Sequence, residues 1–159
     1  MTGRESGTRR TPANTPLLLD VMLGKLTTYL RMCGYDAAYA LDRNVEADDR
    51  LLELSESEGR LLVTRDAQLA RQADGLLLEA KDVTDQLREL ADAGFELELS
   101  KPERCANCNG SLAEVAADAA TPEYAPDPSE VHVWRCPNCD QHFWQGSHWE
   151  SVAETLAEL

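Results

Sequence analysis

Residues 16–34 have the sequence PLLLDVMLGKLTTYLRMCG, and this stretch decides the fold. The apolar run at its start ends in Asp20 and is typical of a buried strand. Across residues 21–33 the apolar side chains recur at helical spacing, and Gly34 is a residue that commonly follows the end of a helix. The stretch therefore predicts a strand that is followed directly by a helix.

The same alternation continues to residue 99. Apolar runs predict further strands at 36–40, 60–64, 75–80 and 95–99. Apolar residues at helical spacing predict helices at 46–58, at 67–73 and around Val83, Leu87 and Leu90 up to residue 93. Regular alternation of strands and helices predicts an α/β domain, a parallel sheet covered by helices, which we place at residues 16–100.

Length and composition bound the remaining possibilities. The chain has 159 residues, of which 43% are hydrophobic, so it can form one ordinary domain and a small second one. No apolar stretch approaches the roughly 20 residues of a membrane span. Residues 1–15 are polar and resemble neither a signal peptide nor an anchor, so we predict a disordered tail there. We expect a cytoplasmic protein without a membrane partner.

The formal net charge is −14, and only three of the 15 basic residues are lysines. An acid-rich, lysine-poor surface fits a salt-loaded cytoplasm, so we expect a halophilic source; the alternative is an ordinary acidic protein. The charge argues against a basic surface for nucleic acids. However, the Debye length is only about 3 Å at 1 M salt, so close contacts and a bound metal could still hold a phosphate.

Four of the five cysteines form two Cys-x-x-Cys pairs, Cys105 with Cys108 in CANC and Cys136 with Cys139 in CPNC. A two-residue gap lets one tight turn direct two thiolates at the same ion, and two such turns complete a four-thiolate shell. The spacing predicts a structural Zn²⁺ site, because no coordination position stays open for chemistry. The alternatives are two disulfides, which need an oxidising compartment, or four unrelated thiols.

The cysteine pairs lie in residues 101–146, whose short apolar runs predict a small β zinc ribbon with strands at 111–115, 131–135 and 142–145. A loop rich in proline and acidic residues separates the pairs and extends a hairpin tip. Residues 147–159 predict a C-terminal helix, with Ser147 and Glu150 as a capping box at its start. Its apolar face can dock on the first domain and contains Trp149, Val152, Leu156 and Leu159.

Aromatic residues gather in and around the predicted ribbon. Exposed aromatics would stack RNA bases, whereas buried ones would form the small core, and we favour the core. His142 and His148 could serve as zinc ligands, but four thiolates make them unnecessary. Cys33, at a predicted helix end, is expected to be a buried small hydrophobe. The aromatic set is Trp134, Phe143, Trp144 and Trp149.

Acidic residues stand where the predicted strands end and the next helices begin. In a parallel sheet these points share one edge, where ligands bind. Converging carboxylates repel one another unless a cation lies among them, and hard oxygen ligands suit Mg²⁺ or Mn²⁺. Such a cluster is what metal-assisted phosphodiester hydrolysis needs. The acids that topology brings to this edge are Asp20, Asp42, Asp48, Asp49, Asp66 and Asp82.

Some of these acids need no function, because aspartate is common in the first turn of a helix. Asp20 and Asp66 are harder to dismiss, since each comes after a buried strand. An aspartyl phosphatase of the haloacid-dehalogenase kind would need a second aspartate at position 22, which is Met22. A phosphoacceptor receiver domain would need adjacent acids at the first strand, where Leu19 precedes Asp20, and a late lysine, for which Lys81 is a loose candidate.

Together, four stretches resemble the Mut-seven C-terminal RNase family, in which a PIN-like ribonuclease domain precedes a zinc ribbon. The resemblance extends over residues 16–159 and implies a PIN-like three-layer fold, RNA as the partner and metal-dependent cleavage of RNA. The stretches are LLLDVMLGKLTTYLRMCGYD (17–36), DDRLLELSESEGRLLVTRD (48–66), RCANCNGSL (104–112) and WRCPNCDQHFWQGSHWE (134–150).

The resemblance also implies which acids bind the catalytic metal. The first acid of the family matches Asp20, and the acid of its Thr-x-Asp motif matches Asp66. The helix acid matches Asp48, with Asp49 as the close alternative. Three carboxylates can hold one Mg²⁺ or Mn²⁺ with several waters. A fourth acid, and with it a second metal, is left open; its candidates are Asp42 and Asp82.

Three residues could support this acidic site. Lys25 comes one turn after Asp20 and Arg65 adjoins Asp66, so either cation could bind a scissile phosphate or serve as a simple counter-charge. Thr64 could orient Asp66 by a hydrogen bond or could only be a good strand residue.

Two functions from different classes follow. The leading hypothesis is an endoribonuclease in which Asp20, Asp48 and Asp66 bind Mg²⁺ or Mn²⁺ and Lys25 or Arg65 steadies the phosphate. The alternative is a non-catalytic adaptor that binds RNA or protein through the ribbon and has a degenerate acidic edge. A protein partner or a homodimer is left open.

Overall fold

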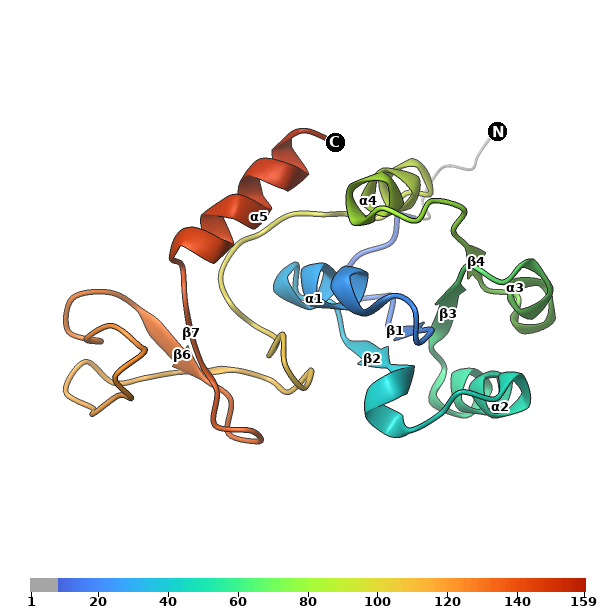
Figure 1. Ribbon diagram of the computed structural model, residues 1–159. Coiled ribbons are helices and arrows are strands. Elements are labelled where there is room, and N and C mark those ends of the chain that lie inside the picture. The colour runs from blue at the N-terminus through green and yellow to red at the C-terminus, as the bar shows by residue number, and fades with distance from the viewer. Residues whose placement is uncertain (1–8) are drawn as a thin grey trace.

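The computed structural model describes residues 9–159, and its first part is a sheet with helices on both faces (Figure 1). Within the described residues this sheet has four strands in the order β2-β1-β3-β4, and all neighbours are parallel. The predicted α/β architecture is confirmed. The elements are β1 Leu17–Leu19, α1 Gly24–Met32, β2 Ala37–Tyr39, the 3-10 helix η2 Ala40–Arg43, α2 Asp48–Glu58, β3 Leu61–Thr64, α3 Ala67–Ala73, β4 Leu76–Leu77 and α4 Val83–Asp92.

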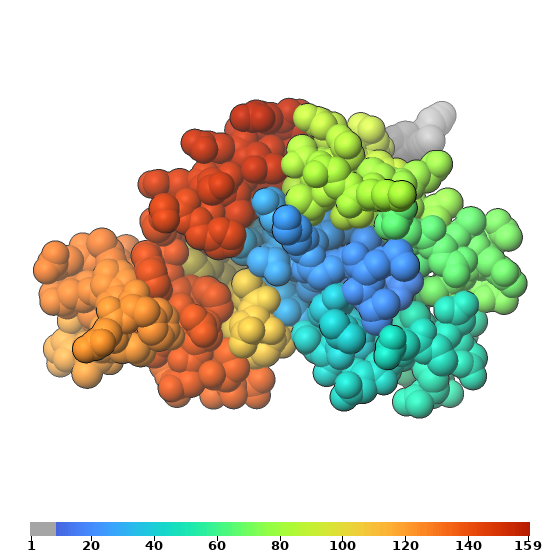
Figure 2. Space-filling view, viewed as in Figure 1, coloured from blue at the N-terminus to red at the C-terminus, as the bar shows by residue number. Residues whose placement is uncertain are grey.

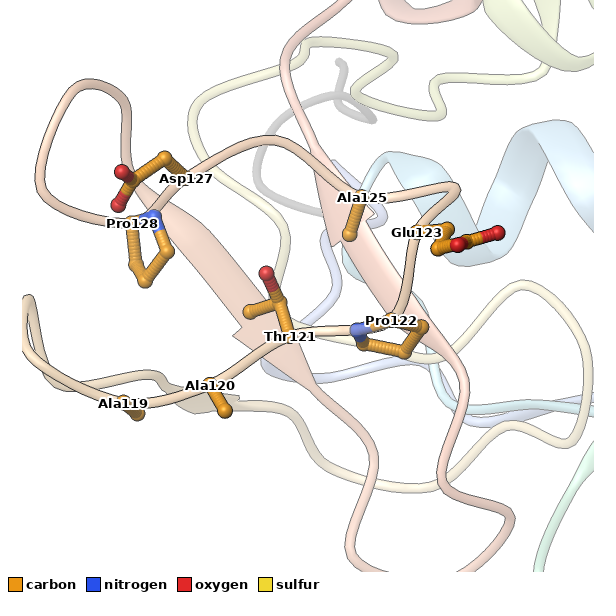
Figure 3. Close-up of a pocket in the computed structure, with 8 residues that line it drawn as sticks. All are labelled: Ala119, Ala120, Thr121, Pro122, Glu123, Ala125, Asp127 and Pro128. Carbon is orange, nitrogen blue, oxygen red and sulfur yellow. The ribbon is translucent and has the colours of Figure 1, made fainter.

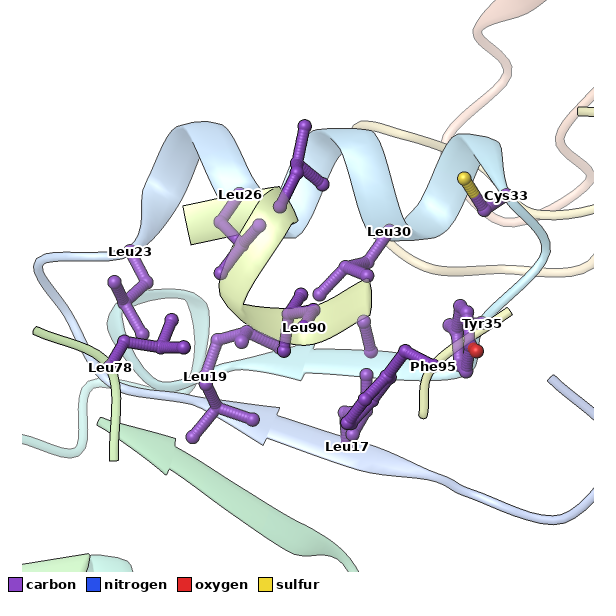
Figure 4. Close-up of a cluster of buried hydrophobic side chains, with 13 residues drawn as sticks. Leu17, Leu19, Leu23, Leu26, Leu30, Cys33, Tyr35, Leu78, Leu90 and Phe95 are labelled. Carbon is purple, nitrogen blue, oxygen red and sulfur yellow. The ribbon is translucent and has the colours of Figure 1, made fainter. Parts of the chain in front are cut away.

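Strand β1 shows why helices cover both faces of the sheet. Its three leucines are fully buried, as is typical of parallel sheets. Leu17 and Leu19 belong to a core cluster with residues of α1 and α4, which Figure 4 shows beneath α1. Leu18 belongs to a second cluster with residues of α2 and α3. Because successive side chains of a strand point to opposite faces, one short strand contributes to both cores.

The second part of the chain is a small antiparallel sheet followed by a helix. The sheet has the strand order β5-β6-β7, and both strand pairs are antiparallel. In Figure 2 this part lies to one side of the α/β domain, and the last helix, α5, reaches towards α4. Val152 of α5 is buried, and Leu156 packs against the core beneath α1 and α4. The elements are β5 Ala113–Glu114, β6 Val133–Arg135, β7 His142–Trp144 and α5 Ser147–Ala157.

The strand predicted at 95–99 does not form. Phe95 alone makes an isolated parallel bridge, and its partner is Arg10. The alternating apolar residues are used for packing instead, because Leu97 and Leu99 lie against the core beneath α1 and α4. The alternation therefore indicated burial correctly, although no strand ladder accompanies it.

Residues 9–15, which we predicted to be part of a disordered tail, contact the domain. The amide of Arg10 donates to the carbonyl of Gly94 at 2.9 Å. The hydroxyl of buried Tyr35 donates to the carbonyl of Arg10 at 3.0 Å. These contacts hold the segment against the end of α4, so the prediction is wrong for residues 9–15. The rest of the predicted tail, residues 1–8, lies outside the described residues.

The helix predicted from residue 21 begins later, at Gly24. The amide of Leu23 donates to the carbonyl of Asp20 at 2.9 Å, so the chain makes a turn between β1 and α1. Strand β4 is also shorter than the predicted 75–80, because only Leu76 and Leu77 pair with β3.

The capping box predicted for the last helix is wrong. The N-cap of α5 is Gly146, and no side chain caps the helix. Ser147 is therefore already the first helical residue. The amide of Glu150 donates to the carbonyl of Gly146 at 3.0 Å, which is the ordinary first hydrogen bond of a helix.

Replacing Leu18 with alanine should lower the free energy of unfolding by about 2–5 kcal/mol, the usual cost of truncating a buried leucine. Leu41 is 51% exposed, so Leu41→Ala should change it by less than about 0.5 kcal/mol. Denaturant unfolding at one salt concentration measures both variants. Equal losses would contradict the placement of β1 between two cores.

Candidate functional site

Asp20 lies at the carboxyl end of β1 and is a buried acid, with 7% of its surface exposed. Its Oδ1 accepts from the amide of Val21 at 2.8 Å, and its Oδ2 accepts from the hydroxyl of Thr64 at 2.7 Å. The pairing of β1 with β3 places the two residues side by side, because Leu19 is in register with Val63. Strand pairing thus fixes the position of the carboxylate.

Thr64 also connects Asp20 to Asp66. Its hydroxyl oxygen accepts from the amide of Asp66 at 3.1 Å while its proton goes to Asp20. We predicted that Thr64 could orient Asp66; it bonds the backbone of Asp66 and the side chain of Asp20. Asp66 is the N-cap of α3, where its Oδ1 accepts from two backbone amides, of Gln68 and Leu69. Its Oδ2 has no hydrogen bond to the described residues.

The strand order makes this place a topological switch point. From β1 the chain continues to β2 on one side of the sheet, and β3 lies on the other side of β1. Ligands in open parallel sheets bind outside the carboxyl ends of strands at such a point. Asp20, Thr64 and Asp66 lie at the carboxyl ends of β1 and β3, which are the two strands that flank it.

The other predicted acids take different places on the same edge. Asp48 is the first residue of α2; it and Asp49 are exposed. Asp42 pairs with the buried guanidinium of Arg31 at 3.4 Å, and Asp82 is the N-cap of α4. Asp42 and Asp82 therefore have structural partners. The carboxylate of Asp48 makes no hydrogen bond to any residue in the described range.

The carboxylates of Asp20, Asp48 and Asp66 do not converge on one point. Among residues 9–159, the cysteines form the only group of three or more potential ligands close enough to share an ion. Asp48 is exposed and has no hydrogen-bond partner among the described residues, so its side chain has room to rotate. Asp20 is fixed, and Asp66 is held at Oδ1 by two backbone amides. The donor set is three carboxylates, which fit Mg²⁺ or Mn²⁺ because these ions prefer hard oxygen ligands. Both oxygens of Asp20 already accept one hydrogen bond, whereas Asp48 and Oδ2 of Asp66 accept none from the described residues.

The two predicted cations differ in their surroundings. Lys25 is exposed in the first turn of α1 and makes no ion pair with a described residue. The Nη1 of Arg65 contacts the Sδ of Met22 at 3.8 Å. Its Nε is buried without a hydrogen-bond partner in the described part of the chain. Arg65 therefore lies across the turn after β1 and keeps donors available.

Tyr39, at the end of β2, is a residue of this edge that the sequence did not single out. Its hydroxyl donates to the carbonyl of Val21 at 2.5 Å. Burial raises its pKa, and the charges of Asp42 and Asp20 raise it further. Nothing in the pattern marks an aromatic residue at a strand end as functional, since tyrosine is common in strands.

The four paired cysteines form a compact cluster in the ribbon. All four sulfur atoms lie within 4.8 Å of one another, and the Cys105–Cys139 and Cys108–Cys136 sulfur pairs are each 3.5 Å apart. Four thiolates at about 2.3 Å from a zinc ion would be about 3.8 Å apart, so the cluster fits a tetrahedral site.

Hydrogen bonds to the sulfur atoms favour the thiolate form that zinc requires, although burial outweighs them at Cys105 and Cys136 and raises the pKa of both thiols. The amide of Cys108 donates to the Sγ of Cys105 at 3.3 Å, and the Nδ2 of Asn138 donates to the Sγ of Cys108 at 3.4 Å. Burial opposes ionisation of Cys108, but bonds from Asn138 and the Gly110 amide outweigh it and lower its pKa to about 7. His142 and His148, the alternative zinc ligands, do not belong to the cluster.

The fifth cysteine has a different environment. Cys33 is buried at the end of α1 within the main core. Burial raises its pKa to about 12, and the nearby charges of Glu96 and Glu98 act in the same direction. Cys33 is therefore a neutral, small hydrophobe, which agrees with the sequence-based expectation.

The aromatic residues of the ribbon pack mainly against protein. Trp134 is buried, and Phe143, Trp144 and Trp149 are half-buried. Phe143, Trp144 and Trp149 line a crevice of about 50 Å³ together with Met32 of α1. A crevice of this size is too small for a base, so these side chains act chiefly as packing between the ribbon, α5 and α1.

A larger hollow lies in the proline-rich loop, as Figure 3 shows. It has a volume of about 410 Å³ and is lined by residues between Ala119 and Pro128. Its lining side chains are mostly alanine and proline, with Glu123 and Asp127. No group of catalytic or metal-binding residues faces it, so we place the functional site at the sheet edge.

The sequence matches the family model of the Mut7-C RNAse domain over residues 15–156, which is nearly the whole chain. The chain belongs to this family. The resemblance inferred from the sequence motifs is thereby confirmed, and membership supports a nuclease function in general. No curated protein and no solved structure matches the chain. In the described part of this Mut7-C chain, no helix has the length and apolar character needed to cross a membrane.

This Mut7-C chain should bind zinc through its four paired cysteines. Replacing Cys136 with alanine removes one thiolate, so zinc content and melting temperature should both fall. Cys33→Ala is the matched control, because Cys33 lies outside the cluster, and it should keep the full zinc content. Elemental analysis of the purified proteins measures zinc directly. Equal zinc content in both variants would contradict the site.

Replacing Thr64 with valine should lower the free energy of unfolding by about 1–3 kcal/mol, the cost of leaving a buried acceptor unpaired. Valine keeps the shape of threonine but leaves Oδ2 of Asp20 without its donor. Thr64→Ser keeps the hydroxyl and should lose clearly less than the valine variant. Urea unfolding compares the two, and a larger loss in the serine variant would show that the methyl group, not the hydroxyl, matters.

Proposed function

We propose that this Mut7-C protein is a metal-dependent endoribonuclease whose catalytic edge contains Asp20, Asp48 and Asp66. The observation that carries the proposal is the buried carboxylate of Asp20, bonded to Thr64 at 2.7 Å at the switch point of the sheet. Burying a carboxylate is unfavourable, so a buried acid at the place where ligands bind is expected to have a function.

Mg²⁺ or Mn²⁺ would be held by these three carboxylates and, when bound, would activate water and stabilise charge on the leaving oxygen. Asp20 supplies the fixed ligand, because strand pairing and Thr64 hold it. Asp66 can offer Oδ2 while Oδ1 continues to cap α3. Asp48 projects from the first turn of α2, where the exposed side chain can turn towards the other two.

Cations on the same edge would bind the substrate phosphate. Lys25 is exposed near the start of α1, and the Nη2 of Arg65 makes no hydrogen bond to a described residue, whereas its Nε is buried. Lys25 follows β1 and Arg65 follows β3, the two strands that flank the switch point. A phosphate beside Asp20 and Asp66 would therefore lie near both cations. A guanidinium can bind a phosphate with two parallel hydrogen bonds, which gives orientation as well as affinity.

RNA is proposed as the substrate because the family is a ribonuclease-domain family. A cytoplasmic location is proposed with it, since free thiolates for zinc need a reducing compartment.

Asp20→Asn should reduce RNA cleavage by at least about 100-fold, because a metal contact worth several kcal/mol is lost and each 1.36 kcal/mol is a factor of ten in rate. The assay uses labelled single-stranded and structured RNA with Mn²⁺, with Mg²⁺ or with a chelator. Asp92→Asn is the matched control. Asp92 is an exposed acid at the C-terminal end of α4, away from the carboxyl edge of the sheet where α4 begins, so this variant should cleave RNA like the unchanged protein.

Two outcomes would overturn the proposal. Equal cleavage by the unchanged protein and Asp20→Asn would remove the assignment of the acidic site. RNA binding without cleavage in any metal would favour the non-catalytic adaptor.

A further inference from the structure

Strand β2 is one of the two outer strands of the parallel sheet, so one side of its backbone lacks a strand partner. Its first residue, Ala37, is nevertheless fully buried. The amide of Ala37 donates to the Oδ1 of Asn109 at 2.9 Å, and the Nδ2 of Asn109 donates to the Oδ1 of Asp36 at 2.7 Å. Asn109 comes directly after Cys108, so a residue of the first cysteine turn covers the edge of the sheet.

A second contact joins the same two places. The guanidinium of Arg31 in α1 is buried, with 3% of the residue exposed. Its Nε donates to the carbonyl of Ala37 at 2.9 Å, and its Nη1 donates to the carbonyl of Ala106 at 3.1 Å. Ala106 lies between the first two cysteines. Both backbone groups of Ala37 are therefore bonded by side chains that are tied to the first cysteine turn.

The geometry of that turn fixes the side chain of Asn109. Asn109 has a φ of 72°, and its amide donates to the carbonyl of Cys105 at 2.8 Å. Asp140 holds the same position in the second turn, with a φ of 68° and an amide bond to Cys136 of 2.7 Å. The two turns have the same backbone conformation but differ in their contacts. Asp140 bonds Arg135 within the ribbon, whereas Asn109 bonds the α/β domain.

From Ala37 the strand leads to the candidate catalytic edge. Tyr39, two residues further along β2, donates to the carbonyl of Val21, and Val21 follows Asp20. Arg31 reaches the edge by another route, since its Nη2 bonds Asp42 at 3.4 Å. A shift of β2 would therefore displace the backbone beside the buried carboxylate.

We infer that the metal-bound first cysteine turn is a clamp on β2, in which Asn109 and Arg31 are positioning residues for the catalytic edge. Zinc has the role of holding the turn in the shape that aims Asn109 and the carbonyl of Ala106 at the strand. The effect on catalysis rests on the proposed function; the clamp itself does not, because it is a contact between ribbon and sheet.

Asn109→Gly and Asp140→Gly form a matched pair of variants. Glycine tolerates the left-handed conformation, so each substitution removes a side chain without straining the turn. Zinc content should stay the same in both. In Asn109→Gly, the amides of residues 36–43 should exchange hydrogen about tenfold faster, the factor expected when a hydrogen bond of ordinary net strength is lost. In Asp140→Gly, exchange there should match the unchanged protein.

Cleavage measurements then separate positioning from folding. In Asn109→Gly, kcat should fall about tenfold or more, since a 1 Å misplacement can cost about 100-fold, whereas KM for RNA should change little. Chelating zinc from the unchanged protein should raise exchange at 36–43 more than in α3, on the far face of the sheet. Identical exchange over 36–43 in the two glycine variants would overturn the clamp. Faster exchange with unchanged kcat would overturn only its catalytic role, and inactivity of the unchanged protein would refute the proposed function alone.

Discussion

The hydrogen bond from Thr64 to the buried carboxylate of Asp20 is the interaction on which the arrangement of the site depends. An acid with 7% exposure is tolerated only if its oxygens are bonded, and here a neighbouring strand and the next amide provide those bonds. The bond exists because β1 pairs with β3, and that pairing also makes the switch point. The same strand register therefore builds the fold and places the acid.

The second constraint is the free edge of β2. Sheet edges must be covered, charged or shortened, because unpaired backbone groups attract other chains. Here the ribbon covers the edge with one asparagine and one carbonyl, and the buried Arg31 completes the contact. A ribbon with so little core of its own needs a metal for stability. A metal bound by the four cysteines would thus also support the outer edge of β2.

Strong local patterns gave the parallel sheet, its helices and the cysteine cluster, because burial, helical spacing and thiolate spacing are each encoded within a few residues. Contacts between distant segments could not be predicted in this way. The alternation at 95–99 indicated burial, but the pairing of Phe95 with Arg10 joins segments 85 residues apart and depends on the tertiary fold. Similarly, the sequence placed Thr64 beside Asp66, while its bond to Asp20 spans 44 residues and follows from strand register.

The net charge of −14 makes the placement of the cations informative. Arg31, Arg43, Arg60 and Arg88 each pair with a carboxylate in the described structure. Eight cations pair with none there. Four of these, Lys25, Arg50, Arg65 and Lys81, stand after a strand end or in the first turn of a helix, where the carboxyl edge lies, and the other four, Arg10, Arg71, Lys101 and Arg104, lie elsewhere. Cations at helix N-termini are not favoured by the dipole, so helix stability does not account for them. The proposed RNA substrate would account for the four at the edge, because beside an acidic site these residues would supply the attraction that the rest of the surface opposes.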